Sequence, residues 1–400
     1  MLLPSASLLA SITGMLILLR LRLHPGFAIF AGSLIISLLV LPLNETPSIL
    51  MQSLLNYQTL RLLVIIASAL TLSGLMQEKG LLAQLAETLE KIAPKLAVHL
   101  IPAVIGFVPM PAGALVSATA SHDSLQRLGT TPEQSTFINY WFRHLWEFCL
   151  PVYPAIIATS VLLAVPLSSV IMTLLPGTFL AIISGTAVSY TILKKLPETE
   201  RKPHKNITYN LLKACWPIIL LVLSILLGVD AMVAFPLVLL LLALQQRARW
   251  RELVKSLKYG LDPKIMFFLY AVMLYKATIE SAGVAVAVFS DMQTVGLPIV
   301  VILAALPFLI AFITGNSLAF VGIAFPLLLP SIVSPTGFNN YALLLSYTSG
   351  IVGLLLSPLH LCLTLSAEYF KAILSKIYKY ILPPSIAIEA IVMLLYYVAV

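Results

Sequence analysis

Long apolar runs separated by short polar segments make up most of this chain. Runs of about 18 to 25 residues recur from end to end, and each is long enough to cross the hydrocarbon of a bilayer. Such runs lie near residues 5–20, 25–43, 59–76, 167–193, 208–228, 229–246, 263–280 and 380–400, and two longer segments lie near 136–165 and 340–370. This pattern predicts an all-α polytopic membrane protein.

Two further apolar stretches, 97–120 and 297–331, contain polar interruptions. The first interruption runs from Pro109 to Gly113 and the second from Thr314 to Ser317. A helix that breaks inside lipid needs protein or a water-filled cavity to satisfy the freed backbone groups. Each stretch therefore predicts a re-entrant helical hairpin, in which the chain turns back to its own side of the membrane.

The segments 136–165 and 340–370 are too long for single spans. About 30 helical residues measure about 45 Å, whereas the hydrocarbon is about 30 Å thick. Pro151 and Pro154 divide the first segment, and Ser357 to His360, with Pro358 among them, divide the second. Proline interrupts a helix because it lacks an N–H and clashes with the preceding turn. Both segments are predicted to be discontinuous helices with breaks near the middle of the membrane.

Residues of the first half recur in the second half at a slowly drifting spacing. Gly80 and Gly283 are 203 residues apart, whereas Tyr140 and Tyr347 are 207 apart. Such drift is typical of a diverged internal duplication. Each half holds five crossings and a hairpin, and an odd number of crossings inverts the second copy. We therefore predict two inverted-topology repeats at 1–193 and 207–400, joined by a cytoplasmic linker at 194–206.

Composition excludes a soluble protein and places the chain in a membrane. Hydrophobic residues make up 60% of the chain, charged residues 10%, and the mean hydropathy is +1.01. The net charge of +8 does not indicate nucleic-acid binding, because Lys and Arg collect in a few connecting segments, as the positive-inside rule expects. Threading on that rule predicts a multi-pass protein of the cytoplasmic membrane with both termini outside.

The three cysteines do not indicate a disulfide framework. Cys149, Cys215 and Cys362 are odd in number, each lies within an apolar run, and no C-x-x-C is present. They are interpreted as small buried fillers rather than ligands.

The interruptions predict a binding site for an anion. A hairpin tip and a helix break at one depth bring together unpaired N–H groups and helix N-termini, which suit a carboxylate. Carbonyls exposed at the second tip could hold Na⁺. The candidate substrate- or ion-binding residues are Pro111, Gly113, Ser117, Thr119, Pro151, Tyr153, Thr314, Gly315, Asn316, Ser317, Ser357, Pro358 and His360.

Structural alternatives exist for several of these candidates. Small residues at the second tip would also permit close helix packing. The hydroxyls of Ser117 and Thr119 would either line a site or bond to carbonyls one turn back. A lone buried histidine such as His360 is often only a hydrogen-bonded core residue.

Arg143, His144 and Glu147 precede the first break and have no charged counterparts in the second half. A charged group at membrane depth costs at least about 2.5 to 3.5 kcal/mol unless it is paired or hydrated. One interpretation gives proton coupling to His144 or Glu147 and an anion contact to Arg143. The other places all three at the cytoplasmic interface, with Arg143 and Glu147 paired at i, i+4.

Two motifs, residues 106–113 (GFVPMPAG) and 357–362 (SPLHLC), resemble an uncharacterised integral membrane family within the ion transporter superfamily, which includes gluconate permeases and dicarboxylate symporters. The resemblance implies an elevator-type transporter, often dimeric, with scaffold helices at 1–43 and 208–246. In the dicarboxylate branch each hairpin tip carries Ser-Asn-Thr. Here Asn316-Ser317 keeps part of that pattern, and residues 111–113 lack it.

The sequence thus predicts a secondary active transporter that moves a small organic anion by Na⁺ or H⁺ coupling. The expected partners are this anion, membrane lipids and a second copy of the chain in a homodimer. We expect no catalytic residue, metal or cofactor beyond Na⁺ as a candidate coupling ion. Two alternatives are a membrane subunit of a tripartite-type transporter and a membrane-embedded metalloenzyme. For the latter, His144 and Glu147 form His-x-x-Glu, but no H-E-x-x-H is present.

Overall fold

The computed structural model describes residues 4–21, 23–81, 84, 89, 94–110, 113–194, 207–296, 298–334 and 337–399. Apart from two short strands, β1 (Val333–Ser334) and β2 (Gly337–Phe338), its regular elements are helices. The all-α prediction is therefore confirmed for this part of the chain. Of the predicted linker 194–206 only Lys194 is described, and Pro111 also lies outside the described residues.

The helices of the first half are α1 (Pro4–Arg20), α2 (Pro25–Val40), α3 (Thr46–Leu55), α4 (Tyr57–Glu78), α6 (Pro94–Ile105), α7 (Gly113–Arg127), α8 (Pro132–Arg143), the 3₁₀ turn η1 (Leu145–Phe148), α9 (Pro154–Leu163) and α10 (Leu167–Leu193). Those of the second half are α11 (Ile207–Leu226), α12 (Ala231–Gln245), α13 (Trp250–Gly260), α14 (Pro263–Ser281), α15 (Val284–Val295), α16 (Ile299–Thr314), α17 (Ser317–Ile332), α18 (Asn340–Leu356), α19 (Leu361–Phe370) and α20 (Leu374–Ala399).

Several of these helices can cross a membrane. Among the described residues, α4, α10, α20 and the segment Asn340–Phe370 have the length and hydropathy of a span. Shorter apolar helices of 10 to 17 residues pack beside them. The outer face of α10 exposes Met172, Phe179 and Ile183, which suits contact with lipid. The chain is a multi-pass membrane protein.

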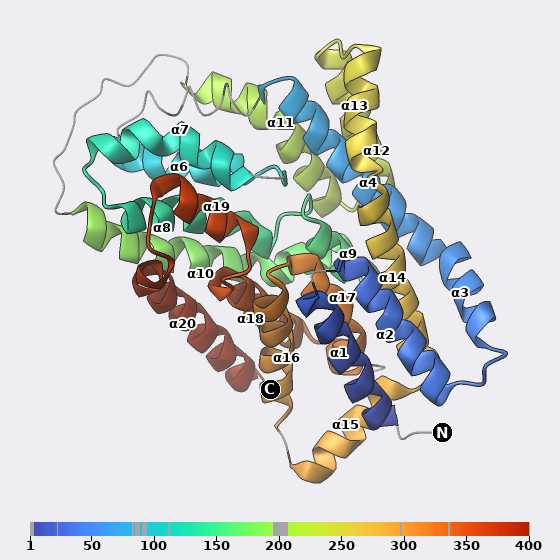
Figure 1. The fold of residues 1–400 in the computed structure, drawn as a ribbon. Helices are drawn as coiled ribbons and strands as arrows, with labels where there is room; N and C mark the ends of the chain where they lie inside the picture. The colour runs from blue at the N-terminus through green and yellow to red at the C-terminus, as the bar shows by residue number, and fades with distance from the viewer. Residues whose placement is uncertain are drawn as a thin grey trace.

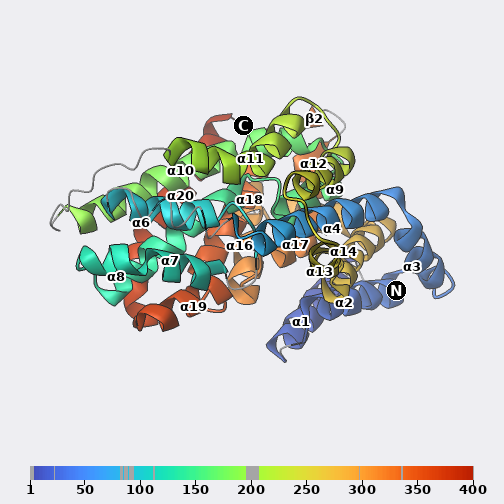
Figure 2. The same ribbon diagram turned by 90° about the horizontal axis from the view of Figure 1, so that it is seen from above.

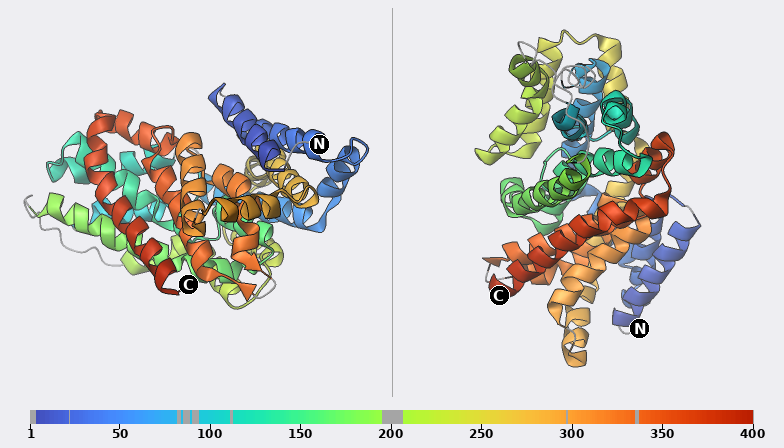
Figure 3. Two further views of the ribbon diagram at one scale, coloured as in Figure 1. Left: turned by 90° about the horizontal axis from the view of Figure 1, so that it is seen from below. Right: turned by 90° about the vertical axis from the view of Figure 1, so that its left-hand side faces the viewer.

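Helices from the two halves pack on each other in reciprocal pairs. Helix α2 packs on α14 while α12 packs on α4, and α9 packs on α17 while α19 packs on α7. In the same way α8 packs on α20 while α18 packs on α10. Figures 1 and 2 show α8, α10 and α20 toward one end of the molecule, α18 near its middle, and α2, α4 and α14 toward the other end. The N-terminal helices lie apart from the C-terminal helix in both views of Figure 3.

Both predicted hairpin ranges contain a break between two helices that pack on each other. Helix α6 ends at Ile105 and α7 begins at Gly113, whereas only Gly315 and Asn316 separate α16 from α17. Gly315 adopts a φ of 63°, a left-handed conformation that favours glycine and ends α16. The Asn316 side chain then accepts the backbone N–H of Ala319 and begins α17.

The long segments 136–165 and 340–370 are also interrupted. Helix α8 ends at Arg143, the 3₁₀ turn η1 follows, and α9 begins only at Pro154. In the second segment α18 ends at Leu356 and α19 begins at Leu361. These interruptions carry the polar side chains of the candidate site.

Candidate binding site between the helix breaks

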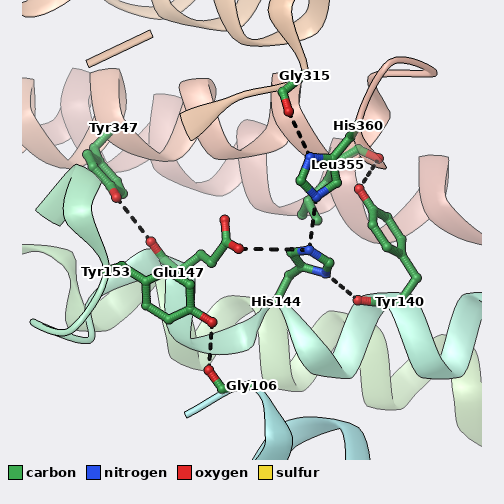
Figure 4. A network of polar contacts seen from close by, with 9 residues as sticks. All are labelled: Gly106, Tyr140, His144, Glu147, Tyr153, Gly315, Tyr347, Leu355 and His360. Carbon is green, nitrogen blue, oxygen red and sulfur yellow. Dashed lines mark hydrogen bonds and ion pairs between the residues drawn. The ribbon is translucent and has the colours of Figure 1, made fainter. Parts of the chain in front are cut away.

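The two broken segments meet through a pair of histidines. His144 follows α8 in the first half, and His360 precedes α19 in the second. Their Nε2 atoms lie 3.0 Å apart, although 216 residues separate them in sequence (Figure 4). Both side chains are buried, with exposed fractions of 1% and 8%. The site therefore lies inside the protein, where the two breaks converge.

Backbone carbonyls fix both imidazole rings. The Nδ1 atom of His144 lies 2.6 Å from the carbonyl oxygen of Tyr140, and Nδ1 of His360 lies 2.8 Å from that of Gly315 (Figure 4). A carbonyl oxygen only accepts hydrogen bonds, so each Nδ1 carries the donating hydrogen. The second bond also joins the break before α19 to the tip of the α16–α17 hairpin.

Three buried tyrosines hold the breaks in place. The hydroxyl of Tyr140 donates to the carbonyl of Leu355 in the other half at 3.1 Å, and that of Tyr347 donates to the carbonyl of Glu147 at 3.1 Å. Tyr153 donates to the carbonyl of Gly106 at 2.6 Å. The first two bonds are reciprocal between the halves, because Tyr140 and Tyr347 are the matched residues of the sequence repeat.

The charged residues of the first break are buried. Arg143 is 2% exposed and Glu147 is 8% exposed, so they do not lie at a solvated interface. An Oε1 atom of Glu147 lies 3.8 Å from Nε2 of His144, and its Oε2 has no hydrogen-bond partner. This places a carboxylate, an imidazole pair and a guanidinium within one polar cluster.

The Arg143 guanidinium lies against the start of α7. A Cβ atom on Gly113 would be 2.0 Å from Nη2 of Arg143, so the approach depends on glycine at this position. The side chain also interacts with the Tyr153 hydroxyl, while its Nε has no partner. Among the described residues, no carboxylate oxygen lies within 4.0 Å of the Arg143 nitrogen atoms. The guanidinium is thus a buried cation that contacts no carboxylate of the described residues, although Glu147 and Cys362 lie close enough to interact with it electrostatically.

The remaining candidates have mainly local contacts. The hydroxyl of Ser357 donates to the carbonyl of Phe312 at 2.6 Å, which ties the second break to the second hairpin. The hydroxyls of Thr314, Ser117 and Thr119 donate to carbonyls of their own helices.

The predicted site residues also differ in how far they are exposed to solvent. Ser117, Pro151 and Ser357 are buried, Ser317 and Pro358 are half-buried, and the side chains of Thr119 and Asn316 are exposed. The structure thus brings Arg143, His144, Glu147, Tyr153 and His360 together and leaves Thr119 and Asn316 outside that cluster.

Two residues beside this polar cluster were not among the site residues predicted from the sequence. Cys362, interpreted as a filler, lies beside the histidines: its Sγ and one nitrogen of each of His144 and His360 lie within 4.8 Å of one another. The spacing His-x-Cys at 360–362 was the available signal. Asn139 is the second; its Nδ2 donates to the carbonyl of Ala114 and to Oγ of Ser366, and so joins α7, α8 and α19.

Comparisons with known proteins agree with a membrane fold of this kind. The family model described as "Protein of unknown function (DUF401)" matches residues 3–399. The crystal structure of the YdaH transporter from Alcanivorax borkumensis is similar, with a TM-score of 0.63 and 13% sequence identity. The match covers 90% of this chain and 89% of that chain. No curated protein sequence matches.

Proposed function

This chain belongs to the DUF401 family of proteins of unknown function, and we propose that it is a secondary active transporter for a small organic anion, specifically a carboxylate. The similar fold of a protein described as a transporter supports membrane transport as the activity. The polar cluster between the breaks is the proposed binding site.

The buried Arg143 guanidinium is the observation that carries the anion assignment. A charge at membrane depth without a counter-ion in direct contact costs several kcal/mol, and a bound carboxylate would supply that contact. Helix α7 begins at Gly113 directly beside the guanidinium. The N-terminal N–H groups of a helix add positive partial charge, so the carboxylate would find donors from two sources.

The reciprocal packing of α2 with α14 and α4 with α12 supports two inverted repeats, as does the reciprocal pair of Tyr140 and Tyr347. We propose the elevator arrangement of the ion transporter superfamily for this chain. Helices α1, α2, α11 and α12 would form the scaffold of a homodimer in the cytoplasmic membrane. The hairpins and broken helices would move as one body, driven by Na⁺ or H⁺, with both termini outside.

A thermal-shift panel tests the proposed site. Purified protein is heated with each of a set of small carboxylates, with and without Na⁺ and at two pH values. A ligand at about 100 times its Kd stabilises the folded state by about 2.7 kcal/mol, so a true substrate raises Tm. Arg143→Gln is expected to abolish the shift, whereas Arg61→Gln, which removes a partly exposed pair with Asp230, is expected to keep it. A panel in which no carboxylate stabilises the wild type contradicts the proposal.

A further inference from the structure

We propose that His144, His360, Cys362 and Glu147 form a binding site for a divalent transition-metal ion of the borderline-soft class, represented by Zn²⁺. This inference goes beyond transport and does not depend on it. It rests on the geometry of four side chains that come from two halves of the chain.

The orientation of the imidazole rings favours a cation between them. Each Nδ1 donates its hydrogen to a backbone carbonyl, so in the neutral rings each Nε2 carries only a lone pair. These two lone pairs face each other across 3.0 Å. Two acceptors at this distance repel unless a positive species lies between them. Histidines that ligate metals typically donate the other ring N–H to a carbonyl in this way.

Cys362 and Glu147 extend the pair to a set of four ligands. The Cys362 Sγ and the two imidazole nitrogens lie within 4.8 Å of one another, and Glu147 Oε1 lies 3.8 Å from His144 Nε2. In a tetrahedral zinc site with bonds of about 2.0 to 2.3 Å, neighbouring ligand atoms are about 3.3 to 3.7 Å apart. Shifts of about 1 Å at the His144, His360 and Cys362 atoms would bring two nitrogens and a sulfur to these distances. Glu147, whose Oε1 lies near His144, is the candidate fourth ligand, and zinc accepts this combination of donors.

The charges of the cluster balance around a divalent ion. A Cys362 thiolate and the Glu147 carboxylate together supply two negative charges, which equal the charge of the metal. The neighbouring Arg143 guanidinium would then be available to pair with a separate anion. A lone proton between the imidazoles would satisfy their lone pairs but would leave the buried Glu147 Oε2 without a partner.

Metal analysis of the full chain, purified in detergent through a tag without histidine, tests the site. We expect roughly one Zn²⁺ per chain by elemental analysis. After chelation, Co²⁺ should restore occupancy with visible d–d bands and a near-ultraviolet thiolate-to-cobalt band. His360→Gln should weaken Co²⁺ binding by at least about 10-fold. Cys362→Ser should remove the thiolate band, and Cys362→His should retain the metal without that band.

Matched controls come from residues of the same types elsewhere in the fold. Cys149 contacts Thr178 and His99 contacts Ser189, and neither lies in the cluster. Cys149→Ser and His99→Gln should therefore keep both metal and spectrum.

The absence of metal and of a cobalt spectrum in monodisperse wild-type protein would overturn the proposal and favour a proton between the imidazoles. Unchanged binding in His360→Gln would overturn it as well. Metal content is measured without any carboxylate, so its outcome is independent of the anion-transport test.

Discussion

Tyr153 and His360 occupy matching positions in the two halves, 207 residues apart, and each donates a hydrogen bond to a carbonyl at the hairpin tip of its own half. Tyr153 bonds to Gly106 and His360 bonds to Gly315. Each helix break is thereby attached to its neighbouring hairpin. Such attachments would let a hairpin and a broken helix move as one unit, as an elevator mechanism requires.

Removal of the Tyr153 hydroxyl should destabilise the fold. Tyr153→Phe leaves the Gly106 carbonyl without its partner, and an unsatisfied buried group costs about 1 to 3 kcal/mol. Unfolding in detergent followed by circular dichroism measures the change. The exposed Tyr190 is the matched control, and Tyr190→Phe should stay within about 0.5 kcal/mol of wild type. Equal stabilities of the two variants would refute the attachment.

Gly315→Ala should disrupt the contact between the second hairpin and the second break. An alanine Cβ would lie 2.7 Å from the Leu359 carbonyl carbon and 2.8 Å from the His360 nitrogen, both backbone atoms. Gly283 is a suitable control because its φ of 61° is close to the 63° of Gly315, while nothing lies within 4 Å of its Cβ position. Both substitutions carry the left-handed strain of about 1 to 2 kcal/mol, and only Gly315→Ala adds the clash. Thermal unfolding should show the larger loss for Gly315→Ala, and equal losses would argue against the close approach.

Gly113→Ala should affect binding more than stability. The new Cβ would meet the far end of the Arg143 side chain, which can move aside. We therefore expect carboxylate affinity to fall by about 10-fold or more, equivalent to about 1.4 kcal/mol. Titration of a carboxylate found in the thermal-shift panel measures the affinity. Gly14→Ala is the control, because its Cβ would meet only the end of the Ile35 side chain, and it should bind the carboxylate normally. Unchanged affinity in Gly113→Ala would contradict the contact between Arg143 and the anion.

The helix breaks could be predicted from sequence because proline, glycine and short polar groups stand out in apolar stretches. The all-α membrane fold followed from the same pattern. The burial of Arg143 and Glu147 could not be predicted, because a charged residue near a break suits an interface and an interior equally well. The contact of His144 with His360 depends on how two halves pack across 216 residues, which periodicity does not encode. The position of Cys362 beside the two histidines depends on the same packing of the halves.

A surface pair outside the spans should give a pH dependence. Lys79 Nζ lies 2.5 Å from Glu252 Oε2 and joins the end of α4 to α13. The hydrogen bond from Lys79, together with that from the backbone N–H of Arg249, lowers the pKa of Glu252 in the folded state. A lowered folded-state pKa gives stability that is present above the unfolded-state pKa and is lost as the pH falls through the folded-state pKa.

Thermal unfolding from neutral to acidic pH checks this dependence. The stability advantage of wild type over Glu252→Gln should be present at neutral pH and should shrink as the carboxylate protonates. Glu280→Gln provides a control, because Glu280 lies 3.8 Å from Lys276 in a looser pair. An advantage that grows on acidification would contradict the assigned cause.

Uptake into proteoliposomes tests the central claim most directly. A radiolabelled carboxylate that stabilises the protein is added outside vesicles that carry an inward Na⁺ or H⁺ gradient. The account predicts accumulation above that of protein-free vesicles, collapse when the gradient is dissipated, and loss in Arg143→Gln but not in Arg61→Gln. Uptake no greater than in empty vesicles, for every carboxylate that binds, would contradict it.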